Sequence, residues 1–409
     1  MSQATVAPGG TVAGRPQPQT TAEAAGAGGP FIRSAPDGRR AQYVATTGVN
    51  GLMSQPTVSM PGYAKGYRIN WNIVGVNAAA LTLAADFPDS IAQLVQMKDA
   101  FGTQLLTGPG YVILKEVNLY SGQFGTDLMR DPLNSPQQTV WNTSSGQGSP
   151  AASGINPAGF AFSRYLSFEF AKAYGVISGA NAALLPVLQI NTGPIASIFG
   201  TGAPTSLTMT ETVDSDFYWL PSAPVDPPGL GTTCQWIYQP SNPTIPASAS
   251  QLVQLPRLGG YLTMLILEMR DAAGLRDDSA WPVRPKLLID GVPLIDTLFT
   301  TWVEDLAIST GIGAGANFSA SNTSSTQTGT VPVQRPAGTF GINRKTSLAQ
   351  RDFGLLDTGE IFLSTNPGTQ LEIGGFPWGP GDGSNPHTLN ATVGQIVPSG
   401  TLVQGLPEI

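Results

Sequence analysis

The chain contains a faint copy of part of itself, displaced by 194 residues. Gly66-Tyr67 opens one segment that is typical of a β-strand, and Gly260-Tyr261 opens another. The pairs that match at this offset without a gap are Ala78-Ala79 with Ala272-Ala273, Leu81 with Leu275, Pro88 with Pro282, and Leu94 with Leu288. This period is too long for a solenoid repeat or a propeller blade. The repeat therefore predicts two similar domains in tandem.

Both copies begin with a predicted strand. The segment GYRINWNIVG places Tyr67, Ile69, Trp71 and Ile73 on one face and polar residues on the other, which is the pattern of a half-buried strand. GYLTMLILEM, at residues 260–269, is continuously apolar and predicts a fully buried strand. Further predicted strands cover residues 111–120, 165–171, 206–212, 234–238, 360–363 and 370–373, and a C-terminal tail contains 393–397.

One amphipathic helix is predicted, from about Pro293 to Ile308. Its apolar residues recur at helical spacing and form one stripe. The stripe consists of Ile295, Leu298, Phe299, Trp302 and Leu306. We expect this helix to pack on its own sheet rather than on a partner.

The composition favours an all-β protein with long loops. Only 11% of residues are charged, 41% are hydrophobic, and there are 49 glycines and 35 prolines among 409 residues. Frequent turn residues between strand candidates are typical of a Greek-key sandwich. Few charges also suit a protein whose sides are buried against neighbours, because interface cores are depleted in charge.

No catalytic, cofactor-binding or metal-binding residues are predicted. A net charge of −7 argues against a nucleic-acid binder, and the single histidine, His387, cannot form a histidine-based metal site. GIGAGA at Gly311 lacks the strand and helix that a dinucleotide loop needs. Asp277-Asp278 is interpreted as a solvated turn. The single cysteine, Cys234, excludes an internal disulfide.

The first 50 residues are rich in Ala, Gly, Pro and Thr and predict a flexible arm. Arg15, Arg33, Arg39 and Arg40 outweigh Glu23 and Asp37, so the arm carries a charge of +2, which would suit an anionic lipid surface or a genome. No signal peptide and no membrane span of about 18 apolar residues is recognised. We therefore expect a protein that is soluble as made.

Three segments in order resemble a known family. KGYRINWNIVG, AADFPDSIAQLVQM and GYVILKEVNLYSGQFG resemble the opening of the first jelly roll of double jelly-roll major capsid proteins of tectivirus-like tailless icosahedral dsDNA bacteriophages. LEMRDAAGL falls where the second jelly roll should open, and RDFGLLDTGEIFLSTNPGTQLEIGG resembles its late strands. The resemblance covers most of residues 55–375, with short motifs.

The resemblance implies two tandem eight-stranded jelly-roll β-sandwiches with a few short helices. It implies pseudo-hexagonal homotrimers that tile an icosahedral shell over an internal membrane, without enzymatic activity. The expected partners are neighbouring trimers, minor capsid or vertex proteins, and the membrane through the N-terminal arm, with no sequence-specific nucleic acid. The expected location is the virion, assembled in the host cytoplasm. Loops 121–160, 221–250 and 309–338 would form external towers.

The predicted domains are a flexible arm at 1–54, a first jelly roll at 55–240, a linker at 241–252 and a second jelly roll with a tail at 253–409. The alternative function is a two-domain receptor- or carbohydrate-binding virion protein, which would use exposed Trp141, Trp236 and Trp378. A β-sandwich glycoside hydrolase ranks last, because no convergent pair of carboxylates is apparent.

Overall fold

The structure is a computed structural model, and it describes part of the chain. The described residues are 31, 35–54, 62–75, 86, 88–99, 102, 104–120, 159–169, 175–179, 185–199, 206–221, 227, 232–240, 245, 252–255, 261–271, 274–310, 318–321, 326–329, 338–343, 354–355, 361–364, 371–375, 378–379 and 387–398. The candidate loop at Gly311, Trp141 and residues 1–30 of the arm lie outside them.

The first lobe is a sandwich of two sheets, and strands that follow one another in the sequence often belong to different sheets. One sheet has the order β1 (Asp37–Thr47), β9 (Leu207–Trp219), β3 (Gly62–Gly75) and β6 (Gly159–Ser167), with β7 (Ile177–Ser178) beside β3. The other runs β2 (Leu52–Ser54), β8 (Val187–Thr192), β4 (Ala92–Lys98) and β5 (Gln104–Gly108). These pairings are antiparallel.

The second lobe repeats this order. One sheet runs β10 (Thr232–Gln239), β21 (Thr388–Pro398), β12 (Tyr261–Arg270) and β17 (Thr339–Asn343), extended by β19 (Ile361–Ser364) and β18 (Gly354–Leu355). The other runs β11 (Val253–Gln254), β20 (Leu371–Gly374), β13 (Lys286–Ile289) and β14 (Val292–Asp296). A separate hairpin joins β15 (Phe318–Ser321) to β16 (Thr326–Gly329), inside the segment predicted to be a loop.

Each lobe thus has the eight-stranded order of a jelly roll. The all-β prediction is confirmed. The internal repeat falls on equivalent strands, because β3 and β12 occupy the same place in their sheets, as do β4 with Leu94 and β13 with Leu288. One detail of the prediction is wrong: β3 begins at Gly62, so Gly66-Tyr67 lies inside the strand, whereas Tyr261 does begin β12.

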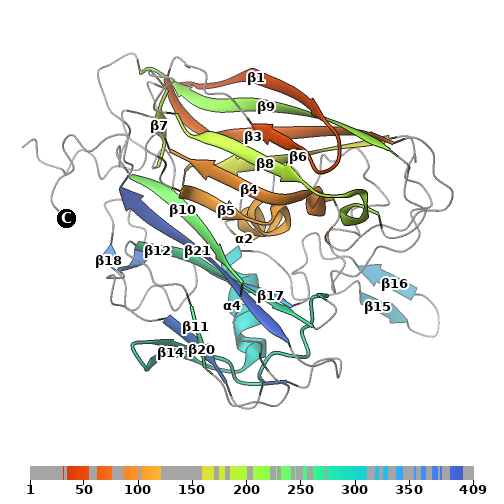
Figure 1. Cartoon of the computed structure of the whole chain (residues 1–409). Coiled ribbons are helices and arrows are strands. Elements are labelled where there is room, and N and C mark those ends of the chain that lie inside the picture. The colour runs from red at the N-terminus through yellow and green to blue at the C-terminus, as the bar shows by residue number, and fades with distance from the viewer. Residues whose placement is uncertain are drawn as a thin grey trace, which may run out of the picture.

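The lobes share a sheet. Strand β5 of the first lobe pairs with β10 of the second in parallel, and this contact merges two sheets into one of ten strands. Figure 1 shows three layers: the sheet of β1 at the top, the ten-stranded sheet across the middle and the sheet of β14 at the bottom.

The alternation of side chains explains which face of each strand is buried. In β3, Tyr67, Ile69, Trp71 and Ile73 are at most 1% exposed, as their spacing predicts. In β9, every second residue from Leu207 to Phe217 is buried. This inward set includes a carboxyl group, Glu211, among apolar side chains.

Residues 111–120 are a helix, so the predicted strand there is wrong. The segment forms a π-helical turn, η3 (Tyr111–Glu116), followed by α2 (Val117–Tyr120). Nearly all of its side chains are buried, and a helix that is apolar on all sides is a helix enclosed by protein. Periodicity cannot separate such a helix from a buried strand.

The second helix, α4 (Phe299–Thr310), confirms the predicted stripe in part. Trp302 and Leu306 are buried, and the Trp302 ring lies 5.2 Å from the Phe340 ring of β17, so α4 packs on its own lobe as expected. The predicted N-terminal end is wrong. Ile295 belongs to β14, and Leu298 is exposed.

The helices occupy the same place in each lobe. The η3–α2 helix follows β5, and α4 follows β14, the strand equivalent to β5. The internal duplication therefore extends to a helix that the sequence comparison missed.

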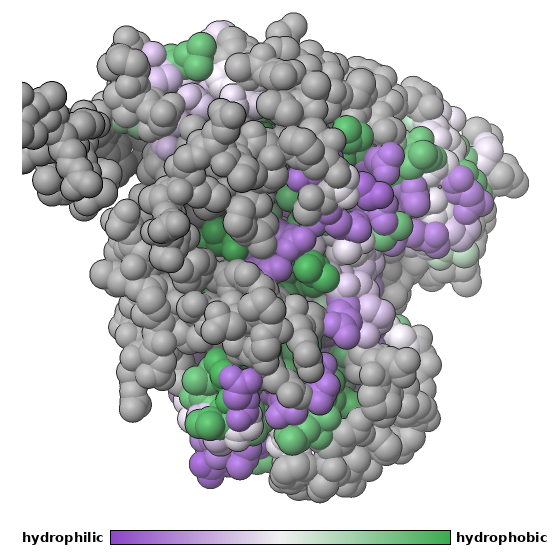
Figure 2. Space-filling view, turned by 60° about the vertical axis from the view of Figure 1, so that its left-hand side comes forward, coloured by the Kyte–Doolittle hydropathy of each residue, from purple (hydrophilic) through white to green (hydrophobic). Residues whose placement is uncertain are grey.

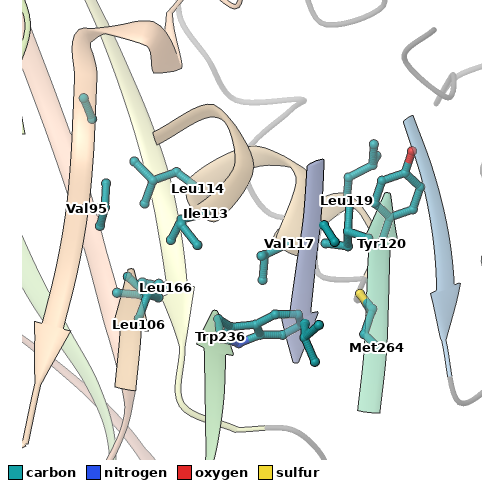
Figure 3. Packing of buried hydrophobic residues seen from close by; sticks show 14 of the residues in the cluster. Val95, Leu106, Ile113, Leu114, Val117, Leu119, Tyr120, Leu166, Trp236 and Met264 are labelled. Carbon is teal, nitrogen blue, oxygen red and sulfur yellow. The ribbon is translucent and has the colours of Figure 1, made fainter. Parts of the chain in front are cut away.

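One hydrophobic cluster runs through both lobes. It joins Val95 and Leu106 of the first lobe to Trp236 and Met264 of the second. Figure 3 shows the η3–α2 helix at the centre of this packing, with Val117 above the Trp236 ring. The two jelly rolls are thus packed on a shared core.

The pairing of strands bears on where one lobe ends and the next begins. Strands β1 and β2 lie in the range that the sequence assigned to the flexible arm, and both pair with strands of the first lobe. Strand β10 lies in the range assigned to the first jelly roll, and it pairs along its whole length with β21 of the second.

Candidate functional site

The two lobes contact each other through the backbones of β5 and β10, and we call this contact and the side chains around it the joint. Leu106 and Thr107 of β5 lie opposite Trp236 and Ile237 of β10. Close approach depends on Gly108, since a Cβ there would lie 2.8 Å from Cβ of Tyr238. The strands are also linked through Gln235, whose Nε2 donates a hydrogen bond to the Gln104 carbonyl over 2.5 Å.

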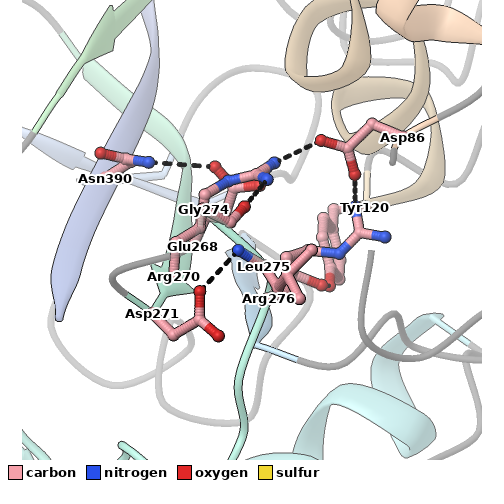
Figure 4. Close-up of polar contacts among 10 residues, drawn as sticks. Asp86, Tyr120, Glu268, Arg270, Asp271, Gly274, Leu275, Arg276 and Asn390 are labelled. Carbon is pink, nitrogen blue, oxygen red and sulfur yellow. Dashed lines mark hydrogen bonds and ion pairs between the residues drawn. The ribbon is translucent and has the colours of Figure 1, made fainter. Parts of the chain in front are cut away.

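A carboxylate of the first lobe lies between two arginines of the second. The Oδ2 of Asp86 accepts a hydrogen bond from Nη2 of Arg270 over 2.7 Å. The Oδ1 of Asp86 forms an ion pair with Nη1 of Arg276 over 2.7 Å. Arg270 also donates to Glu268, and Glu268 accepts a further hydrogen bond from Nδ2 of Asn390 over 3.2 Å. Figure 4 shows this chain of contacts from β21 through β12 to Asp86.

Charged side chains of the η3 helix complete the cluster. The guanidinium of Arg276 lies 4.1 Å from the centre of the Tyr111 ring, and Nζ of Lys115 lies 4.8 Å from it on the same helix. Such cation–π contacts gain strength when they are shielded from water. Lys115 and Glu116 are both buried.

Burial and neighbouring charges determine which of these groups are ionised. Burial would raise the pKa of Asp86, but Arg276 and Arg270 hold it below its ordinary value. Burial, together with the nearby charge of Arg276, lowers the pKa of Lys115 to about 7. Burial raises the pKa of Glu116 well above its ordinary value, and the carboxylate of Glu268 adds to this shift. Its surroundings thus favour the neutral form of Glu116 and the charged form of Asp86.

A second buried ion pair lies within the first lobe. Arg164 of β6 donates from Nε to Oδ1 of Asp89 over 2.7 Å and from Nη2 to Oδ2 over 3.2 Å. Both side chains are at most 2% exposed. Burial raises the pKa of Asp89, although Arg164 opposes the shift. The pair fastens β6 to the turn η2 (Asp89–Ile91) that precedes β4.

This arrangement can orient the two lobes relative to each other, because its ion pairs cross from one lobe to the other. Asp86 and Glu268 are each paired with an arginine. Among the described residues, no group of three His, Cys, Asp or Glu side chains could hold a metal ion. In the same part of the chain, no helix is long and apolar enough to cross a membrane. The energy gained by a buried ion pair is largely offset by the cost of removing both charges from water, whereas loss of one partner is strongly destabilising.

Several residues singled out in the sequence have structural positions. His387 is buried, and its Nε2 lies 3.3 Å from Oδ2 of Asp277. Asp277 also accepts hydrogen bonds from Ser279, as expected of a turn residue. Cys234 is a free, buried thiol in β10. Trp236 and Trp378, which the carbohydrate-binding alternative needs on the surface, are 7% and 1% exposed.

The sequence analysis missed the joint. The sequence patterns select none of the charged residues that form it, which are Asp86, Lys115, Glu116, Arg270 and Arg276. One pattern could have selected some of them. Only 11% of the residues are charged, and charged residues are rarely buried unless they are paired, so a charge within an apolar segment indicates a buried partner.

No protein-family model matches the chain, and no curated protein matches it. Solved structures do. The crystal structure of the STIV MCP matches with a TM-score of 0.58 at 12% identity, covering 91% of this chain and all (100%) of that one. A structure of Sulfolobus Turreted Icosahedral Virus matches with a TM-score of 0.55 at 12% identity, covering 91% of this chain and 94% of that one. The Faustovirus major capsid protein matches with a TM-score of 0.52 at 8% identity, covering 89% of this chain and 90% of that one.

These matches define the class of fold: the chain has the double jelly-roll fold of viral major capsid proteins. Both jelly rolls, in order and nearly at full length, are shared with the STIV capsid protein.

Proposed function

We propose that the chain is the major capsid protein of an icosahedral virus and forms homotrimers that tile its shell over an internal membrane. The observation that carries this proposal is the pair of complete jelly rolls with one strand order, joined through the pairing of β5 with β10. Three copies of such a pair would present six similar lobes around a threefold axis. The protein acts by contact between surfaces and not as an enzyme.

We further propose a redrawn division of the chain. The first jelly roll begins at β1 and ends with β9, and the second begins at β10. The segment between Pro221 and Thr232 connects them, in place of the linker at 241–252. Residues 1–30 remain the proposed arm toward the membrane, with segments 121–158 and 309–338 as proposed towers and neighbouring trimers and vertex proteins as partners. The tower predicted at 221–250 is wrong, because β10 lies within that range and belongs to the shared sheet. Assembly in the host cytoplasm of a bacterium remains a prediction.

Light scattering coupled to size-exclusion chromatography tests the trimer. The expected mass is three times that of the 42.6 kDa chain, and electron microscopy should show particles with a hexagonal outline. A monomer at high protein concentration would contradict the proposal. Flotation with anionic vesicles tests the arm: the full chain should float, and a chain that lacks residues 1–30 should not.

The carbohydrate-binding alternative gains no support, because two of its three tryptophans are core residues.

A further inference from the structure

The carboxyl group of Glu116 is enclosed at the joint without a hydrogen bond. Its side chain is 0% exposed, and neither Oε1 nor Oε2 has a hydrogen-bond partner among the described residues. Figure 2 shows polar side chains on one outer face of the molecule, where water can solvate them, whereas Glu116 lies inside. A carboxyl group in such a place is more stable with its proton than without it, because burial disfavours the charged form.

The helix directs Glu116 toward the second lobe. In the π-helical turn η3 the hydrogen bonds span five residues, and the Val117 amide accordingly donates to the Val112 carbonyl. Glu116 therefore lies on the same side of the helix as Tyr111, and in addition to burial its charge raises the pKa of Tyr111. The guanidinium of Arg276 lies 4.1 Å from the centre of the Tyr111 ring, so this side faces the second lobe.

Both lobes place titratable or charged groups around Glu116. Burial raises the pKa of Tyr238 on β10, and the charges of Glu268 and Glu116 add to the shift, so Glu116 also acts across the joint. Strand β5, which packs on η3, carries no titratable residue. The surrounding groups are Asp86, Asp89, Tyr111, Lys115 and Arg164 of the first lobe, and Tyr238, Glu268, Arg270 and Arg276 of the second.

The arginines among these groups already have carboxylate partners. The ion pairs are Arg164 with Asp89, Arg270 with Glu268, and Arg276 with Asp86. The carboxylate of Glu268 instead repels an ionised Glu116. Ionised Glu116 would thus add an unmatched negative charge to a set of balanced ion pairs, at a place that crosses from one lobe to the other.

We infer that the proton on Glu116 holds the two lobes together, and that the joint loosens as the pH rises toward neutrality. If the joint opens, water reaches the carboxyl group and its ordinary pKa of 4.5 applies, whereas burial and Glu268 raise this pKa in the closed joint. Above about pH 4.5 the open joint therefore releases a proton that the closed joint retains, so the free energy of opening falls with rising pH. The inference concerns a single chain and does not depend on assembly.

Lys115 limits the pH range in which Glu116 acts alone. Burial, with Arg276, lowers the pKa of Lys115 from 10.5 to about 7 in the closed joint. Above pH 7 the open joint would take up a proton on Lys115, which opposes the effect of Glu116. Below pH 7 Lys115 is charged in both states, and Asp86, whose pKa is held below 3.8, is ionised in both above pH 5. The range from pH 5 to pH 7 thus isolates Glu116.

The labelling rate of a buried thiol measures the opening. Val117 packs on the Trp236 ring of the second lobe and is 6% exposed, so a thiol in its place becomes accessible when the lobes separate (Figure 3). A Cys234→Ser/Val117→Cys chain is treated with a maleimide at pH 5, 6 and 7, with and without Glu116→Gln. The ratio of the two rates cancels the reactivity of the thiol itself. This ratio, Glu116 over Glu116→Gln, should rise by about tenfold or more from pH 5 to pH 7, since each pH unit contributes at most about tenfold.

The matched control is Glu211→Gln in the same thiol chain. Glu211 is a second buried carboxyl group whose pKa is raised by burial, but it lies within the first lobe. Its substitution should leave the labelling rate of the thiol with the same pH dependence, because separation of the lobes does not expose it. The chain that keeps Glu116 should also show the trend by itself, relative to its labelling rate in denaturant at each pH.

Two results would overturn the inference. A Glu116→Gln ratio that is constant from pH 5 to pH 7 would show that the proton on Glu116 does not control the joint. An equal pH dependence of the ratio for Glu211→Gln would show that the thiol is exposed by unfolding of the first lobe and not by separation of the lobes. Neither result bears on the proposed trimer, which light scattering tests separately.

Discussion

Asp86 and Arg276 form an ion pair of 2.7 Å, although they are 190 positions apart and belong to different jelly rolls. Arg270 reaches the same carboxylate over 2.7 Å. A single side chain of the first lobe is thus held by two from the second, at the place where β5 and β10 merge two sheets. The orientation of the two lobes is set at this joint, and a regular ring of lobes needs that orientation to be the same in every copy.

Removal of this carboxylate should weaken the joint. Asp86→Asn leaves the buried Arg276 without its carboxylate partner, while Arg270 keeps Glu268. Breaking a buried ion pair typically costs about 3–5 kcal/mol. Denaturant unfolding at pH 7 should report this loss. The control is Asp296→Asn, which removes the partner of Arg284 at an exposed site and should have a much smaller effect.

The same pair should make stability depend on acid. The pKa of Asp86 is below its ordinary value in the folded state, where Arg276 and Arg270 outweigh burial. Its contribution is therefore complete above the unfolded pKa and is lost as the pH falls toward the folded one. The wild type should lose more stability than Asp86→Asn between pH 5 and pH 2. If the free energies of unfolding of the two proteins fell in parallel with pH, Asp86 would not be the source of the acid sensitivity.

Glu211 should oppose folding at neutral pH. Burial raises its pKa from 4.5 to about 7, and its Oε2 has no hydrogen-bond partner among the described residues. The unfolded chain releases this proton above pH 4.5 while the folded chain retains it, so the cost grows up to about pH 7 and then stays constant. Glu211→Gln should therefore stabilise the protein by about 2–3 kcal/mol at pH 8 and have little effect at pH 4. The control is Glu304→Gln, which alters an exposed residue of α4. This substitution should leave the free energy of unfolding unchanged at both pH values.

A side chain at Gly108 should push the lobes apart. A Cβ there would lie 2.8 Å from Cβ of Tyr238 and 3.0 Å from Cγ1 of Ile113. Gly108→Val should destabilise the protein by about 1–3 kcal/mol, which is typical of an overpacked core. Gly48→Ala is the control, because its Cβ would make an ordinary contact of 3.7 Å with the Leu207 carbonyl. Equal losses for the two variants would argue against a close approach at the joint.

Trp236 should be needed for folding and not for ligand binding. It is 7% exposed and lies at the shared core beneath the η3–α2 helix. Trp236→Ala should cost about 3–5 kcal/mol in denaturant unfolding. The carbohydrate-binding alternative would regain support if the wild type bound to a glycan array, the variant did not, and both proteins were equally stable.

The local patterns predicted the elements that have one buried face. Alternation in β3 selected Tyr67, Ile69, Trp71 and Ile73, and all are buried. Helical spacing selected Trp302 and Leu306 on α4, which are buried as well. The type of hairpin between β13 and β14 could also have been predicted from Asp290-Gly291, whose φ values of 49° and 78° fit a two-residue turn.

Local patterns failed where an element is buried on every side. Residues 111–120 are buried nearly throughout, and enclosure from all directions removes the periodicity that separates a helix from a strand. The ion pairs between the lobes could not be predicted for a different reason. Asp86 meets Arg270 and Arg276 only because the chain folds back across about 190 residues, and no local pattern carries that information.

The sequence by itself determined that the protein is all-β and duplicated, since alternation and the 194-residue repeat are properties of the chain alone. Only the tertiary structure decided which distant strands pair and how the two lobes are joined. Strand β1 pairs with β9, and β10 with β21, over separations of more than 150 residues. Pairing between distant strands is set by hydrogen bonding and burial in the whole fold, so the shared sheet appears only there.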